Sequence, residues 1–177
     1  MKKNLLLTPI LTIILASILV TNTAMSSPTT LLSTQPLPCT SPATTTFDLN
    51  VTVTDVLNLY GWEFNMTFNP TVLNVVNVNE GPFLLDFAYQ LGGENTTWFF
   101  VVGPDNINGW VQVGCSLFDS YPPHQGYPPD GPDGNGVLTT ITFSVKMKGK
   151  SDLHFQETKL NTVDPGTHLP VLSLIHI

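Results

Sequence analysis

The sequence predicts an all-β protein, a sandwich or jelly roll of many short strands. Three observations support this fold class. Apolar and polar residues alternate with a period of two in several segments, and Gly, Pro, Asn and Asp separate those segments at short intervals. We find no helical periodicity along the chain. Short strands with turn residues at this spacing are typical of sandwiches and jelly rolls.

The regular pattern begins at Phe47. Phe47, Leu49, Val51 and Val53 alternate with polar residues and predict a strand with one buried face. After a turn over residues 55–58 the alternation returns, and large apolar side chains occupy every second position from Tyr60 to Phe68. This segment is therefore expected to be a central strand over a thick core.

Six further strands are expected along the rest of the chain, with breaks at Asn69-Pro70 and Gly81-Pro82. They cover residues 72–78, 97–102, 110–117, 137–145, 153–155 and the neighbourhood of 168–171.

Residues 1–26 have the order of a secretory signal peptide. Lys2 and Lys3 precede an apolar run from Leu5 to Val20, and small and polar residues follow it. The alternative is an uncleaved membrane anchor, although the run is short for a spanning helix and contains Pro9. Both interpretations place the rest of the chain outside the cytoplasm, secreted or on the cell surface. Residues 27–46 are rich in Ser, Thr and Pro and are expected to be a flexible tether open to O-glycosylation.

The last six residues, 172–177 (LSLIHI), match the translation of a transposon end-sequence used in preparing sequencing libraries. We interpret them as an artefact and leave them out of the fold. A natural strand with this sequence is the alternative. The single expected domain then spans residues 47–171.

The charge excludes some partners. After the signal segment the chain has four Lys, no Arg and thirteen acidic residues, a formal charge of about −9. A protein that binds nucleic acid or an anionic membrane surface needs a basic patch, and we find none. Contact with a membrane is expected only through a signal anchor or through a C-terminal region beyond this sequence.

Export outside the cytoplasm also makes disulfide formation and N-glycosylation relevant to this chain. An oxidising compartment permits a disulfide between Cys39 and Cys115, and two unpaired thiols are the alternative. Asn50, Asn65 and Asn95 each begin an N-glycosylation acceptor triplet.

Several segments, in the same order and at similar spacing, resemble a cohesin domain, most closely the cohesin-like modules of archaeal and bacterial surface proteins. The matching segments are Val53–Leu73, Val78–Leu84 (VNEGPFL), Gly134–Val145, Ser151–Phe155 and Thr158–Leu160. The resemblance implies a jelly-roll sandwich of about nine strands, related in fold to carbohydrate-binding modules. This sequence departs from the family in the segment 118–134, which is longer and richer in Pro than expected. In addition, the family's final strand is expected after Val171, so that this strand is expected to be missing here.

The resemblance implies a function as well. Cohesins hold dockerin domains, and so assemble polysaccharide-degrading enzymes on a scaffold or cell surface. The outward positions of the strand after "LYG" contact the dockerin, and here these are Gly61, Glu63, Asn65 and Thr67. Glu63 matches an acidic contact position, whereas Gly61 replaces a residue that is often polar. A glycan on Asn65 would cover this face, so either that triplet is unused or the face is not the binding face. A solvated strand face is the plain alternative.

Other functions have weaker support. Tyr121 and Tyr127 lie in a Pro-rich loop and could offer rings to a sugar, which would make the chain a carbohydrate-binding module. A structural spacer of a surface protein is a third reading. Residues 130–136 (DGPDGNG) have oxygen ligands for calcium but lack the closing Glu of an EF-hand, so we expect no cofactor and no metal. The histidines lie apart, no catalytic constellation stands out, and we expect no enzyme activity.

Overall fold

The computed structural model of the chain describes residues 31–35, 45–91, 96–118, 131–163 and 170–175. These residues form nine strands and one helix. The strands are β1 (Leu31–Gln35), β2 (Thr46–Val56), β3 (Leu59–Thr67), β4 (Leu73–Glu80), β5 (Thr96–Asp105), β6 (Trp110–Phe118), β7 (Gly134–Val145), β8 (His154–Val163) and β9 (Pro170–Ile175), and the helix is α2 (Pro82–Leu91).

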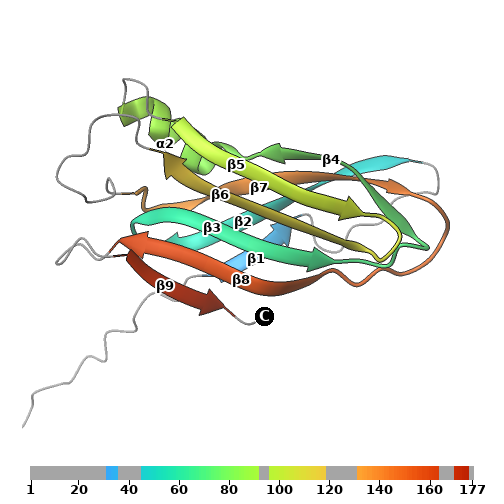
Figure 1. Ribbon diagram of the computed structural model, residues 1–177. Coiled ribbons are helices and arrows are strands. Elements are labelled where there is room, and N and C mark those ends of the chain that lie inside the picture. The colour runs from blue at the N-terminus through green and yellow to red at the C-terminus, as the bar shows by residue number, and fades with distance from the viewer. Residues whose placement is uncertain (1–30, 36–44, 92–95, 119–130, 164–169, 176–177) are drawn as a thin grey trace, which may run out of the picture.

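The strands build two antiparallel sheets that face each other (Figure 1). One sheet has the order β1-β2-β7-β4 and the other the order β5-β6-β3-β8-β9. The predicted all-β sandwich is confirmed, and each strand expected from Phe47 onwards has a counterpart. The prediction was least accurate for β8, which extends from His154 to Val163 rather than over three residues.

The core lies between the sheets and follows from the alternation in sequence. Trp62, Phe64 and Met66 of β3 are buried, as are Leu49, Val51 and Val53 of β2. Aromatic rings join the sheets' inner faces, since Phe68 meets Phe143 edge to face at 5.6 Å between ring centroids. The intervening positions of each strand therefore point outward.

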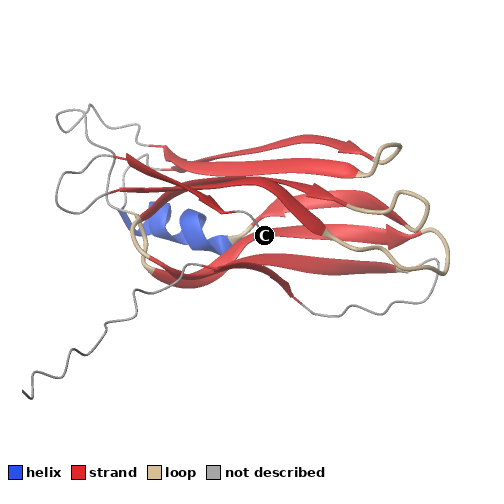
Figure 2. Ribbon diagram, turned by 90° about the horizontal axis from the view of Figure 1, so that it is seen from below, coloured by secondary structure: helices blue, strands red, loops and turns tan. Residues whose placement is uncertain are grey.

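The expectation that the chain has no helix was wrong. Pro82 begins α2, and a proline fits the first helical position because its missing N–H has no helical partner there. Leu84 and Ala88, four residues apart, are buried against the sandwich. Figure 2 shows the helix at one end of the molecule, where it packs against β5, β6 and β7.

The flexible tether predicted for residues 27–46 was wrong for part of its length. Leu31–Gln35 forms β1, which pairs with β2 from Leu31↔Thr54 to Gln35↔Asn50. Leu32 is buried and supplies the apolar contact that holds this short strand. Of the remaining predicted tether, only Thr45 and Thr46 lie within the described residues, and Thr46 begins β2.

The family's last strand was expected beyond Val171, and the structure has a strand there. β9 pairs with β8 from Thr158↔Ile175 to Val163↔Pro170. It includes Leu172 to Ile175, so part of the segment interpreted as an artefact takes part in a sheet; that interpretation stays a prediction. The predicted signal segment 1–26 lies outside the described residues. No helix in the described part of the chain has the length and apolar character that a membrane span requires.

Candidate partner-binding face

The outer face of the β5-β6-β3-β8 sheet contains the residues predicted to bind a partner. Gly61, Glu63, Asn65 and Thr67 alternate with the buried Trp62, Phe64 and Met66, so they lie on the side of β3 away from the core. β3 is flanked by β6 and β8. The predicted positions therefore lie in the middle of this face.

Two neighbouring side chains hold the carboxylate of Glu63 in place on the face. One carboxylate oxygen accepts a hydrogen bond from Gln112 Nε2 of β6, and the other lies 3.5 Å from Lys159 Nζ of β8. The pairing follows from the register, because Glu63 lies between Gly114 and Lys159 on the neighbouring strands. Such a partly exposed ion pair adds about 0–1 kcal/mol to stability. Its main effect is to fix the carboxylate's position.

The other three predicted residues differ in what they can offer. A Cβ added at Gly61 would lie 3.0 Å from the Cys115 carbonyl oxygen and 3.2 Å from Ser116 Cβ, so this position is a closely packed, flat part of the face. The Asn65 Oδ1 is buried and has no hydrogen-bond partner among the described residues. Thr67 is half-buried opposite Trp110 and His154.

An apolar ridge, formed by Trp98, Phe100 and Val102 of β5, borders the polar centre. Trp98 is 66% exposed and Val102 46% exposed, although both belong to a regular strand. The rings of Trp98 and Phe100 are 6.2 Å apart and tilted by 52°. Phe100 lies on Gly114 of β6, where an added Cβ would come within 2.3 Å of the ring. The absence of a side chain at Gly114 thus lets the ring lie against the backbone.

Together these residues give the face an apolar border and a polar centre with a fixed charge. Exposed aromatic rings are enriched at protein interfaces and are common in sugar-binding sites. No cluster of three or more His, Cys, Asp or Glu suited to a metal occurs in the part of the chain that the structure describes.

The residues that complete the face were not predicted from the sequence. Gln112 and Lys159 contact Glu63 from strands 49 and 96 residues away along the chain. The ridge left a local signal, because residues 98–102 (WFFVV) are apolar on both sides of the strand rather than alternating. On a strand with one solvated face, such a run indicates an exposed apolar surface.

Two other groups of predicted sites are only partly described. Asn50 points outward from β2, and its Oδ1 accepts a hydrogen bond from Thr140 Oγ1 at 2.9 Å. Asn95, Tyr121 and Tyr127 lie outside the described residues. Glycosylation of Asn50, Asn65 and Asn95 and sugar binding by the two tyrosines stay predictions.

The segment resembling a calcium loop uses its described oxygens for other contacts. Asp133 Oδ1 accepts the N–H of Asn58, and Asn135 Oδ1 accepts the N–H of Asp55, both at 2.7 Å. Asp130 lies outside the described residues. These contacts tie the two turns together, and the expectation of no metal at this segment stays a prediction.

Cys115 carries a free, buried thiol on the core side of β6. Burial raises the pKa of this thiol, and the nearby carboxylate of Glu80, whose Oε1 lies 3.4 Å from the sulfur, raises that pKa further. Cys39 lies outside the described residues, so its disulfide with Cys115 stays a prediction.

Comparison with solved structures identifies the fold. A type II cohesin domain from the cellulosome of Acetivibrio cellulolyticus superposes with a TM-score of 0.58 at 17% sequence identity, over 75% of this chain and 84% of that one. The second type II cohesin of the adaptor ScaA scaffoldin from the same organism gives 0.57 at 16% identity, over 77% and 85%. No protein-family model and no curated protein matches the sequence.

A third similar structure is a complex of a type II cohesin with an X-dockerin from A. cellulolyticus, with a TM-score of 0.56 at 17% identity over 74% of this chain and 84% of that one. The chain therefore has the fold of a type II cohesin module, as its resemblance to cohesins predicted. At these identities the likeness concerns the fold, and function must be argued from the face itself.

Proposed function

We propose that this protein is an extracellular, non-catalytic binding module that holds a dockerin-type domain on the outer face of β8-β3-β6-β5. The observation that carries the proposal is the combination of an exposed apolar ridge with a charge held in place by Gln112 and Lys159. The cohesin fold supports it, because a solved cohesin of this fold is in complex with a dockerin. Polysaccharide degradation or surface assembly would be the setting.

The energetics of such a contact favour the ridge over the charge. Large aromatic side chains that become buried at an interface commonly carry most of the binding energy. Glu63 is already paired, so it adds less binding free energy. A partner mainly recognises the position and the sign of its charge. We therefore expect Trp98 to set the affinity and Glu63 the choice among partners.

Isothermal titration against the dockerins encoded in the same genome tests the proposal. Trp98→Ala is expected to weaken binding about tenfold or more. Glu63→Lys is expected to change which dockerin binds. Asp48→Ala, on the outer face of the other sheet, is the matched control and should bind like the wild type. The proposal fails if no dockerin binds, or if Trp98→Ala and Glu63→Lys both leave binding unchanged.

Direct binding of a polysaccharide is the second candidate, and the exposure of Trp98 beside Phe100 favours it. A ring of this kind can cover the apolar face of a sugar. A glycan array with the wild type, Trp98→Ala and Tyr121→Ala/Tyr127→Ala decides between the sites. Binding lost only in the last variant would place the sugar on the Pro-rich loop, and absence of binding to every glycan removes this candidate.

A further inference from the structure

We propose that copies of this chain associate end to end, with the β7–β8 loop of one copy docked in a hollow beside α2 of the next. The two surfaces lie at the ends of the sandwich, away from the candidate partner-binding face. The inference is therefore independent of the proposed function.

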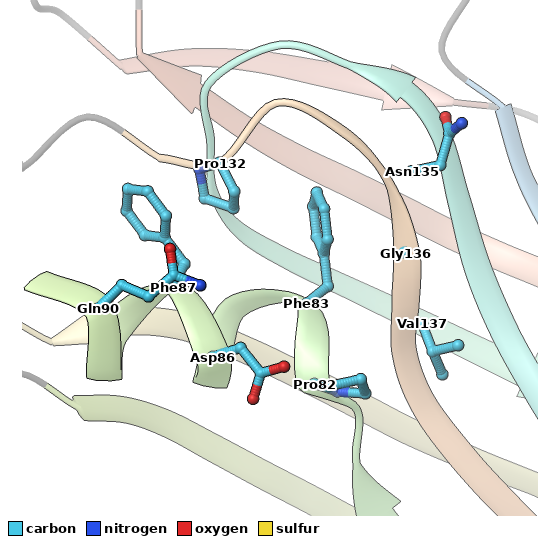
Figure 3. A pocket seen from close by; sticks show the side chains of 9 residues that line it. All are labelled: Pro82, Phe83, Asp86, Phe87, Gln90, Pro132, Asn135, Gly136 and Val137. Carbon is cyan, nitrogen blue, oxygen red and sulfur yellow. The ribbon is translucent and has the colours of Figure 1, made fainter.

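The hollow is a cavity of about 330 Å³ between α2 and the beginning of β7. Its apolar walls are the rings of Phe83 and Phe87, one helical turn apart, together with Pro132. Figure 3 shows both rings rising from the same side of the helix, near Pro132. Asp86 and Gln90 lie at its rim and are exposed. The hollow is thus apolar inside and acidic at its edge.

The end of the molecule that holds the hollow is acidic. Asp55, Asp86 and Asp133 are all exposed there. Asp55 lies near the hollow, because its N–H donates to the Oδ1 of Asn135, one of the lining residues, at 2.7 Å. The described lysines belong to other places: Lys159 pairs with Glu63, and the other three lie in the β7–β8 connection.

That connection forms the opposite end of the sandwich, as Figure 1 shows. Residues 146–150 (KMKGK) hold three of the four lysines that follow the signal segment, around Met147, which is 53% exposed. Lys146 is anchored, because its N–H donates to Val72 O at 2.8 Å and its Nζ to Pro70 O at 2.9 Å. Lys150 pairs with Asp152. Lys148 makes no ion pair with any described residue and remains available to a partner.

The turn between β5 and β6 reaches the same end. Phe68 N–H donates to Gly109 O at 2.8 Å, and the adjoining N–H of Asn69 donates to Ser151 Oγ at 2.8 Å. The turn presents Ile107, which is 87% exposed. This end has three lysines against two aspartates, Asp105 of the turn and Asp152 beside Lys150, together with two exposed apolar side chains. Its described charge is therefore slightly positive, opposite in sign to that of the α2 end.

The two ends are complementary in chemistry. Methionine is unbranched and flexible, and its sulfur makes favourable contacts with aromatic rings, so Met147 suits the apolar walls that Phe83, Phe87 and Pro132 give the hollow. Lys148 would meet the carboxylate of Asp86 at the rim. Elsewhere the acidic surfaces of two copies repel each other, so the basic loop also orients the approach. Because different surfaces of one chain meet, the contact is head to tail and leaves each end of the pair free for another copy.

Sedimentation velocity of the exported chain tests this association. The wild type is expected to form dimers and longer species as its concentration rises, and salt should weaken them. Met147→Ser/Lys148→Ser removes the loop's contacts, and Asp86→Lys/Gln90→Lys makes the rim basic. All four changed residues are exposed, so folding is expected to persist. Each variant alone should associate at least about tenfold more weakly than the wild type.

Mixing the two variants gives the decisive result. The loop variant keeps an intact hollow and the hollow variant an intact loop, so the mixture can make one contact and should stop at a 1:1 dimer. Asp48→Lys, a similar charge change on the outer face of the β1-β2-β7-β4 sheet, should associate like the wild type. A wild type that stays monomeric up to about 1 mM overturns the proposal, as does a mixture without dimers. Equal association of both variants and the wild type would also overturn it. Both variants should bind a dockerin as the wild type does, which separates this result from the fate of the proposed function.

Discussion

At the scale of single residues, the contact between Phe100 and Gly114 determines the shape of the apolar ridge. A side chain at position 114 would occupy the space of the ring, since the added Cβ would lie 2.3 Å from the ring's far carbon. A glycine is therefore needed on β6 for Phe100 to lie against the β6 backbone beside Trp98. The ridge depends on a residue that itself contributes no side chain.

Gly114→Ala should consequently affect binding more than stability. The clash involves the far end of a movable side chain, so the ring can swing away from the sheet, at a cost of about 1–3 kcal/mol. Affinity for the partner should fall as it does in Phe100→Ala, the matched variant that removes the ring without a clash. Titration calorimetry and urea unfolding measure the two effects. A Gly114→Ala protein that binds as well as the wild type would show that Phe100 is not part of the contact.

The buried thiol of Cys115 predicts a dependence of stability on alkaline pH. The pKa of this thiol is raised above its ordinary value of 9.0 by burial and then by Glu80. The folded state therefore keeps a proton that the unfolded state loses, and the free energy of unfolding should fall as the pH rises above about 9. Below that pH this contribution is constant. Urea unfolding across the pH range, compared with Cys115→Ala, isolates the effect.

The same residue provides a test of the predicted disulfide. If Cys39 and Cys115 are unpaired, the denatured protein should show two reactive thiols, and in the folded protein Cys115 should resist alkylation because it is buried and protonated. A Cys39–Cys115 disulfide would leave no reactive thiol and would also abolish the alkaline loss of stability relative to Cys115→Ala.

At the scale of elements, contacts between the sheets fix the hairpin of β5 and β6. Asn106 Oδ1 accepts the Val75 N–H at 2.8 Å, and Asn106 Nδ2 donates to Val75 O at 3.0 Å. Val75 belongs to β4 of the opposite sheet and lies at an irregularity in its pairing with β7. One amide side chain thus replaces the backbone partner that Val75 lacks.

Asn106→Ala should destabilise the protein by about 1–3 kcal/mol, because it leaves two buried backbone groups without a partner. Asn106→Asp is the control: it keeps an acceptor for the Val75 N–H but loses the donor, so its loss should be smaller if the carboxylate is tolerated. Urea unfolding monitored by circular dichroism gives both values. A change below about 0.5 kcal/mol in Asn106→Ala, as expected for an ordinary surface position, would contradict this role.

The elements that could be predicted are those whose pattern is local. β2 and β3 show a period of two over nine or more residues, so their buried faces and the outward positions of Glu63 and Asn65 were predicted correctly. α2 was not predicted because Gly81-Pro82 is typical both of a break between strands and of the start of a helix. A helix of ten residues also has too few turns for its apolar periodicity to be recognised. β1 has one buried leucine, so its strand structure depends on the pairing with β2.

The candidate face was predictable only along one strand. The order β5-β6-β3-β8 places Gln112, Lys159 and Trp98 next to or near β3, but no local pattern specifies which strands become neighbours. The family resemblance therefore supplied the role expected of β3, and the structure supplied the rest of the face.

At the scale of the whole molecule, one core joins both sheets and the helix. Buried residues from β1, β2, β3, β4, α2, β6, β7 and β8 belong to a single apolar cluster. Neither sheet can separate without exposing the inner face of the other, and the free energy of burial is lost for both together.

Unfolding should therefore be a single cooperative transition. Tryptophan fluorescence reports on Trp62 in the core, on the half-buried Trp110 and on Trp98 at the surface, whereas far-ultraviolet circular dichroism reports on all strands. Their urea midpoints should coincide. Two separate transitions would mean that part of the sandwich, such as the α2 end, unfolds independently.

The short strand β1 has a mechanical consequence. Its hydrogen bonds to β2 run perpendicular to the strands, from Leu31↔Thr54 to Gln35↔Asn50. Tension along the chain ahead of Leu31 would load them together, in shear, rather than opening them one by one. Once β1 slipped, Leu31–Gln35 would no longer be held to β2, while the other eight described strands kept their fold. A pull from the N-terminal side would then be absorbed first by β1, which withdraws Leu32 from the core while the rest of the core stays packed.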